Sequence, residues 1–237
     1  IVDYDKYYTG DDVHGPLRHA LTPQSSDIML SKQYCPDTGD AGAAERKAMS
    51  KLPYAELLGS LMWISRGTRL DVIYTVGMLA RVTHNPGIVH WEAALKVLSY
   101  LKSTRDIRLT FNAHTDSDRI TASVDADFLP NYGDEFNNWK STSGYRVYLG
   151  GAAVSWMSKR QDVIATSTAH AETLAAYDCM RDILKLRGLK RDLGFPDCGP
   201  TVMQEDNQTV VRTVLNAGSS SAIKHWCSKI HWIRQCV

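Results

Sequence analysis

The sequence is poor in cysteine, and its cysteines do not have the spacing of structural metal sites. It contains 5 cysteines, none of them in a C-x-x-C pair. We therefore expect neither a zinc site nor a disulfide framework. Scattered, reduced cysteines are typical of an intracellular setting.

The sequence also lacks long apolar runs and a leader. No apolar stretch reaches the roughly 18 residues that span a bilayer. The first residues, "IVDYDKYYTGDD", are polar and acidic, unlike a signal peptide. We expect no membrane partner. Because the chain starts at Ile1 rather than at Met, we also expect a fragment or a product cut from something longer.

An excess of one charge is absent as well. The 27 basic and 26 acidic side chains nearly balance, so no general basic field attracts nucleic acid, and any such binding needs a local patch. A hydrophobic content of 43% is enough for a packed core. A length of 237 residues suits one large domain or two smaller ones.

The first half of the chain predicts a linker followed by helices. Residues 1–52 are rich in Asp, Gly, Ser, Thr and Pro without sustained periodicity, which predicts a linker or extended segment with a short helix in "GDAGAAERKAMSK". Apolar residues at helical spacing predict three helices, over 53–67, 70–87 and 88–105. We assign 53–115 to a small three-helix unit. The expected core anchors are Trp63, Trp91, Trp156 and Trp226.

The second half, residues 116–237, alternates strands and helices. Period-two alternation predicts a strand over 119–128, and Gly150-Gly151 predicts a hairpin within 143–159. A long amphipathic helix follows over 167–189. A strand and two helices are then expected over 200–206, 207–218 and 221–237. The order β-β-β-α-β-α-α predicts an α/β layer in which a hairpin precedes the long helix.

Three acids stand out by position in this second half. Asp125 and Asp206 lie at the ends of predicted strands, and Glu172 lies in the first turns of the long helix. Strand ends in one α/β sheet converge on the edge where ligands bind. Converging carboxylates repel one another unless a cation neutralises them, and hard oxygen ligands favour Mg²⁺ or Mn²⁺.

Each acid also has a simpler interpretation. Asp125 or Asp127 could cap a turn before Pro130. Glu172 could be a solvated helix residue. Asp206 could be the N-cap of the helix that begins at Asn207. The spacing of the residues leaves these alternatives open.

Several ordered motifs carry a resemblance to a known family. The run "KSTSGYRVYLGGAAVSWMSKRQDVIATSTAHAETLAA", with "VDADF", "EDNQT" and "IKHWCSKIHWIR" around it, resembles the ribonuclease H domain of copia-type retrotransposon Pol polyproteins. The helical part, starting at "LPYAELLGSLMWISRG", is similar to the segment that these polyproteins place between the polymerase palm and ribonuclease H. The resemblance covers roughly residues 21–237.

This resemblance implies an α/β, ribonuclease H-like mixed sheet flanked by helices, truncated at its C-terminus and preceded by a reverse-transcriptase connection-like unit. It implies hydrolysis of the RNA strand of RNA–DNA hybrids by two Mg²⁺ or Mn²⁺ ions. The family's catalytic residues fall on Asp125, Glu172 and Asp206, with Asp127 as a reserve metal ligand. The implied partners are the hybrid and the remainder of the Pol polyprotein. The implied location is cytoplasmic, in a virus-like particle, with nuclear presence.

Polar and basic residues near these motifs are candidates for contact with the nucleic acid. Hydroxyls and positive charges at turns and hairpin ends suit phosphate oxygens, although polar turns and solvated hairpin ends have the same composition. The candidates are Lys140, Ser141, Thr142, Ser143, Lys159, Arg160, Asn207, Gln208, Lys224 and His225.

The sequence departs from the family pattern at several positions, and two other hypotheses about its function stay open. The family's fourth acid follows a fifth strand and has no counterpart here, and Cys227 and Phe128 stand where the family usually has Asp and Trp. The family's usual Thr-Glu pair is Ala169-His170. The chain could therefore be a catalytically decayed remnant that still binds nucleic acid. A protein-interaction module built on the three-helix unit is the third hypothesis.

Overall fold

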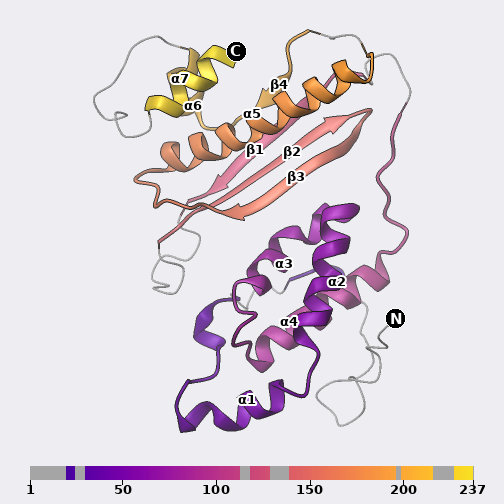
Figure 1. The fold of residues 1–237 in the computed structure, drawn as a ribbon, viewed down its shortest axis with the longest axis vertical. Coiled ribbons are helices and arrows are strands. Elements are labelled where there is room, and N and C mark those ends of the chain that lie inside the picture. The colour runs from indigo at the N-terminus through magenta and orange to yellow at the C-terminus, as the bar shows by residue number, and fades with distance from the viewer. Residues whose placement is uncertain are drawn as a thin grey trace. The chain divides into compact units, whose positions relative to one another are not determined.

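The chain forms two compact units, residues 1–108 and 109–237. The computed structural model describes residues 20–24, 30–112, 118–128, 139–195, 199–215 and 227–236 (Figure 1). Within these ranges, no helix is long and apolar enough to cross a membrane. Each unit is described by itself below.

The described part of the first unit contains four α-helices. They are α1 (Ala43–Met49), α2 (Tyr54–Gly67), α3 (Ile73–Ala80) and α4 (Ile88–Ser103). The three helices predicted from Pro53 onward are confirmed. The second is shorter than predicted, because a 3-10 turn over Leu70–Val72 precedes it and further turns follow it. Apolar side chains of α2, α3 and α4 pack into one core.

Residues 30–52, predicted to belong to a linker, pack against α2, α3 and α4. Leu30 and Met49 are buried in the helical core. The buried His90 ring joins the segment to α4: its Nδ1 accepts the N–H of Gly87 at 3.0 Å, and its Nε2 lies 3.0 Å from the carbonyl oxygen of Ser31. Because Nδ1 accepts a hydrogen bond, Nε2 is the protonated nitrogen, and it donates a hydrogen bond to the carbonyl oxygen of Ser31. The boundaries 1–52, 53–115 and 116–237 stay a prediction.

The tryptophans of the helical unit divide between core and surface. Trp91 is buried, as predicted, but the prediction for Trp63 is wrong, since 82% of this residue is exposed. The buried residues of α2 include Leu57, Leu58 and Leu61. Trp63 follows Leu61 by two positions, about 200° around the helix, so it faces away from that stripe.

The second unit has the predicted element order. Its elements are β1 (Thr121–Asp127), β2 (Thr142–Leu149), β3 (Ala152–Arg160), α5 (Thr168–Asp192), β4 (Val202–Gln204), α6 (Gln208–Leu215) and α7 (Cys227–Cys236). The strands form a sheet in the order β3-β2-β1-β4. Strand β1 runs antiparallel to β2 and parallel to β4, so the sheet is mixed. Gly150 and Gly151 take positive φ values of 63° and 79° at the hairpin turn, where other residues are strained.

Small side chains let α5 lie close against the sheet (Figure 1). Ala171, Ala175 and Cys179, spaced one turn apart, are fully buried and pack in the same cluster as Ala122 and Val124 of β1. The N-terminus of α5 is capped by Ser167, whose Oγ accepts the N–H of His170 at 3.1 Å. This cap and the small-residue stripe fix the first turns of α5 over β1.

Enlarging one residue of the stripe is expected to disturb this packing. Ala175→Leu inserts a larger side chain where α5 meets the sheet, so it should lower the free energy of unfolding by about 1–3 kcal/mol. Lys185→Leu adds a leucine at an exposed position of the same helix and should stay within about 0.5 kcal/mol of the wild type. Urea unfolding of both variants measures the difference. Equal stability of the two variants would show that α5 does not need this close approach.

A candidate metal-binding active site

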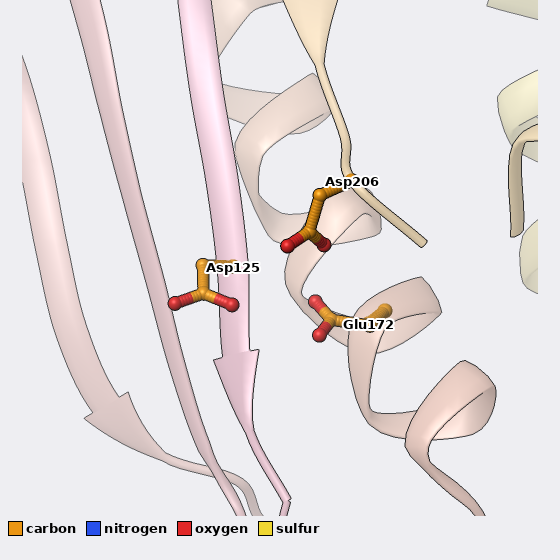
Figure 2. A group of neighbouring side chains, drawn as sticks. All are labelled: Asp125, Glu172 and Asp206. Atoms are coloured by element: carbon orange, nitrogen blue, oxygen red, sulfur yellow. The ribbon is translucent and has the colours of Figure 1, made fainter. Parts of the chain in front are cut away.

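Three carboxylates from three different elements meet at one edge of the sheet. Asp125 lies in β1, Glu172 in α5 and Asp206 two residues after β4. One carboxylate oxygen from each lies within 4.8 Å of the others. Figure 2 shows the three side chains turned toward a common space. This convergence agrees with the prediction from their positions in the sequence.

The parallel pairing of β1 with β4 explains this convergence. Ser123 of β1 is in register with Gln204 of β4. Both strands run in the same direction, so two further residues along each chain bring Asp125 and Asp206 to the same end of the pair. The helix α5 brings Glu172 from above the sheet.

The three acids differ in burial. Glu172 is only 4% exposed, whereas Asp125 and Asp206 are exposed. The site is therefore closed at Glu172 and open to solvent at the two aspartates. The Oε2 atom of Glu172 is buried and has no hydrogen-bond partner within the described part of the chain. A buried oxygen of this kind costs free energy unless something satisfies it.

Negative charge accumulates at the site. Burial raises the pKa of Glu172 to about 8, and the charges of Glu205, Asp125 and Asp206 add to the increase, while a backbone hydrogen bond from Ala126 opposes it. Burial also raises the pKa of Glu205, with Asp206 and Asp125 adding to the effect and a hydrogen bond from the Asn207 backbone opposing it. Among the residues that the structure describes, none of these four acids forms an ion pair with a basic side chain.

A divalent cation fits this arrangement. The donors are carboxylate oxygens, which Mg²⁺ and Mn²⁺ prefer. The carboxylate of Glu172 is turned toward the two aspartates (Figure 2), and its Oε2 has no hydrogen-bond partner among the described residues. The residues present therefore suit a metal ion better than they suit a metal-free structural role.

The simpler interpretations of Glu172 and Asp206 do not hold. Glu172 is not a solvated helix residue, because it is buried. The residue that caps α6 is Asn207, whose Oδ1 accepts the N–H groups of Thr209 at 3.0 Å and Val210 at 3.3 Å. Asp206 is thus left facing the other two acids. Asp127 lies at the end of β1, is exposed, and does not belong to the group of three.

The predicted phosphate-binding hydroxyls face the interior. Ser141, Thr142 and Ser143 are buried, and Ser143 Oγ accepts a hydrogen bond from Nε2 of Gln161 at 2.9 Å. The same nitrogen donates to the carbonyl oxygen of Ala171 at 2.9 Å, one residue before Glu172. These side chains therefore tie the hairpin to the start of α5, and their burial does not suit direct contact with phosphate.

The remaining candidates lie in several places. Lys140 is half-buried and donates to the carbonyl oxygen of Asp162. Lys159 is exposed with its Nζ 3.3 Å from a carboxylate oxygen of Asp162, and Arg160 is half-buried. Gln208 is exposed at the start of α6. Lys224 and His225 lie outside the described residues.

The strand register places Lys159 and Arg160, at the end of β3, at the same end of the sheet as the acids. Asp127 of β1 is paired with Thr142 of β2, which in turn is paired with Arg160 of β3. Lys159 and Arg160 therefore lie two strands away from the end of β1.

The sequence patterns did not single out Glu205, whose charge adds to the raised pKa of Glu172. Residues 200–206 were interpreted as a strand whose functional acid was Asp206 alone. Alternation along a strand places Glu205 on the face opposite to Asp206, so it gave no reason to expect an effect on the same site.

Curated proteins similar to this chain include transposon polyproteins and an effector. The chain is 35% identical over 217 residues to "Retrovirus-related Pol polyprotein from transposon TNT 1-94" of Nicotiana tabacum, covering 91% of this chain and 15% of the polyprotein. It is 32% identical over 192 residues to "Retrovirus-related Pol polyprotein from transposon RE2" of Arabidopsis thaliana, covering 79% of this chain and 13% of that protein. The chain thus spans less than a sixth of the length of these polyproteins.

A third relative is much shorter. The chain is 32% identical over 138 residues to "Secreted RxLR effector protein 161" of Plasmopara viticola, covering 58% of this chain and 94% of the effector. No protein-family model and no solved structure matches the chain significantly. The chain belongs to the sequence family that is shared by these retrovirus-related Pol polyproteins from transposons and the Plasmopara viticola effector.

Proposed function

We propose that the α/β unit is a metal-dependent ribonuclease H that hydrolyses the RNA strand of RNA–DNA hybrids. The observation that carries this proposal is the convergence of Asp125, Glu172 and Asp206 within 4.8 Å of one another. The mixed sheet with a helix packed across it supports the ribonuclease H-like fold that the motifs imply. The relationship to transposon Pol polyproteins supports a role in retrotransposition.

In this proposal, Asp125, Glu172 and Asp206 hold two Mg²⁺ or Mn²⁺ ions. When bound, such ions lower the pKa of a water that attacks the phosphodiester and stabilise the leaving oxygen. The exposed aspartates form the side of the site that a phosphate can approach. The buried Glu172 is held in place by the packing of α5. Lys159 and Arg160 contact the phosphate backbone away from the cleaved bond, and the 2′-hydroxyl distinguishes RNA from DNA.

The proposed partners are the RNA–DNA hybrid and the rest of the Pol polyprotein, including its reverse transcriptase. The proposed location is a cytoplasmic virus-like particle, with access to the nucleus. A gel assay of a labelled hybrid in Mg²⁺ or Mn²⁺ tests the activity. We expect fragments of the RNA strand only, and none in EDTA. Retained hybrid binding without cleavage would instead favour a decayed remnant that binds nucleic acid.

Cation binding is also expected to stabilise the protein. Millimolar Mn²⁺ relieves the repulsion among the carboxylates and binds only the folded site, so it should raise the melting temperature. At 100 times the dissociation constant the gain is about 2.7 kcal/mol, or roughly 5 °C or more for a unit of this size. Differential scanning fluorimetry across a manganese titration measures the shift, with Asp206→Asn as the variant that should lose most of it. An unchanged melting temperature would count against a shared metal.

A further inference from the structure

A basic pocket lies where β1 and β4 begin, at the other end of the sheet from the three acids. The cavity has a volume of about 290 Å³ and is lined by the residues before β1, the C-terminal turns of α5 and the residues before β4. Arg119 lines it, and Asp125 lies six residues farther along the chain, about 20 Å away in extended backbone. This distance exceeds the Debye length of about 10 Å at 0.1 M salt, so the acids have little effect on an anion in the pocket.

Positive charge converges on this pocket from two segments. The basic side chains that line it are Arg119, Arg187, Lys190 and Arg191. Those of α5 stand in its last turns, where positive charge also complements the helix dipole. The dipole does not explain Arg119, which precedes β1, is exposed, and has no acidic partner within ion-pair distance among the described residues. Asp118 and Asp192 partly offset the charge, at 3.9 Å from Lys190 and Arg191.

Hydrogen bonds connect the walls of the pocket. Nη1 of Arg187 donates to the carbonyl oxygen of Gly199 at 2.9 Å and to Oγ1 of Thr201 at 3.3 Å. Nζ of Lys190 donates to the carbonyl oxygen of Asp118. The end of α5 is thus joined both to the segment before β4 and to the segment before β1. The cations are therefore held around one cavity rather than spread along a solvated helix.

An aromatic side chain stands beside these cations. Phe195 lines the pocket and is 58% exposed. A Schellman turn at the end of α5 fixes its backbone: the N–H of Gly194 donates to the carbonyl oxygen of Arg191 at 2.9 Å, and the N–H of Phe195 donates to that of Lys190 at 3.1 Å. Cations beside an exposed ring suit a nucleotide, because cations bind the phosphate and an aromatic ring stacks on the base.

We propose that this pocket binds one nucleotide unit, with its phosphate on Arg119 and the basic end of α5 and its base against Phe195. The volume of about 290 Å³ is close to the lower end of the roughly 300–1,000 Å³ of small-ligand pockets, so it suits one nucleotide rather than a duplex. The same chemistry recognises a free nucleotide and a nucleotide within a single strand. The inference goes beyond the proposed function and requires no metal.

An NMR titration of the isotope-labelled full chain in EDTA tests the pocket without any measurement of catalysis. The probes are AMP, inorganic phosphate and a short oligoadenylate. We expect AMP to shift the amide signals of Gly188 and Gly199, which line the pocket, and to bind about 5-fold or more tightly than phosphate because of stacking. Tighter binding of oligoadenylate than of AMP at these signals would assign the site to a strand, and the reverse to a free nucleotide. Phosphate that binds as tightly as AMP would overturn the nucleotide assignment.

Two variants and a matched control separate the phosphate contact from the base contact. Arg119→Gln should weaken AMP binding by about 5- to 10-fold. Phe195→Ala should weaken AMP binding by about 5-fold or more and leave phosphate binding unchanged. Both residues are exposed, so melting curves should show folded proteins. The control Arg66→Gln removes the same charge from an exposed position of α2 and should bind AMP like the wild type.

Three results would overturn the proposal. If AMP shifts neither Gly188 nor Gly199, the pocket is not the binding site. If Arg66→Gln weakens AMP binding as much as Arg119→Gln does, binding follows the total charge of the protein rather than the pocket. If Phe195→Ala binds AMP like the wild type, the ring does not stack on the base.

Discussion

Replacing Asp125 with asparagine is expected to lower the rate of RNA cleavage by at least about 100-fold, as removal of a single electrostatic group from an active site typically does. Asparagine has nearly the shape of aspartate but lacks the charge that holds a divalent cation. Asp125 is exposed, so its replacement should leave the fold intact. Single-turnover cleavage of a labelled RNA–DNA hybrid, with circular dichroism of the same sample, measures both effects.

The control for this prediction is Asp192→Asn. Asp192 is the last residue of α5 and is exposed at the far end of the helix from Glu172, so its loss should leave cleavage unchanged. Asp127→Asn is a second variant to compare with Asp125→Asn. It should lower cleavage less than Asp125→Asn, because Asp127 lies outside the group of three carboxylates. Wild-type rates for Asp125→Asn would show that the site has been assigned wrongly.

The metal-free protein is expected to lose stability as the pH rises from about 5 to 8. Burial and neighbouring acids raise the pKa of Glu172 from its ordinary value of 4.5 to about 8. The folded protein therefore keeps a proton that the unfolded chain releases above pH 4.5, so stability falls through this window and levels off above pH 8. Each pKa unit corresponds to about 1.4 kcal/mol, which limits the loss to at most about 5 kcal/mol.

Urea unfolding in EDTA at pH 6 and pH 9 measures this loss. Glu172→Gln cannot ionise, so its stability should change much less between the two pH values, and at pH 9 it should exceed that of the wild type. Millimolar Mn²⁺ should restore the wild type at pH 9. Glu56→Gln, which removes a charge from the helical unit, should retain the wild-type pH dependence. If Glu172→Gln shows the same pH dependence as the wild type, Glu172 does not ionise at a buried site.

Local patterns were sufficient to predict most elements of the fold. Alternation of Ile120, Ala122 and Val124 predicted the strand of β1, and these residues are buried in one cluster with residues of α5. The Gly150-Gly151 pair marks the hairpin because a tight turn needs positive φ values. The three acids could be predicted because each stands at an element end or in the first turns of a helix, where converging elements bring them together.

Burial of helical residues was harder to predict, because it depends on packing between distant segments. One face of α5 packs on the sheet through Ala171 and Ala175, while Ala176 and Met180 pack with Ile233 of α7. The N-terminal half of α5 is therefore covered on more than one side. A single amphipathic stripe could not reveal that Glu172 is buried.

Strand β4 has only three residues, in register with Thr121–Ser123 of β1, and Asp206 follows it by two residues. So short a ladder is a place where the sheet can open locally at a lower free energy than the whole unit unfolds. Detachment would carry Asp206 away from Asp125 and Glu172. An ion bound by all three acids would hold the strand in place, so that metal occupancy and local opening of the sheet become a single linked equilibrium.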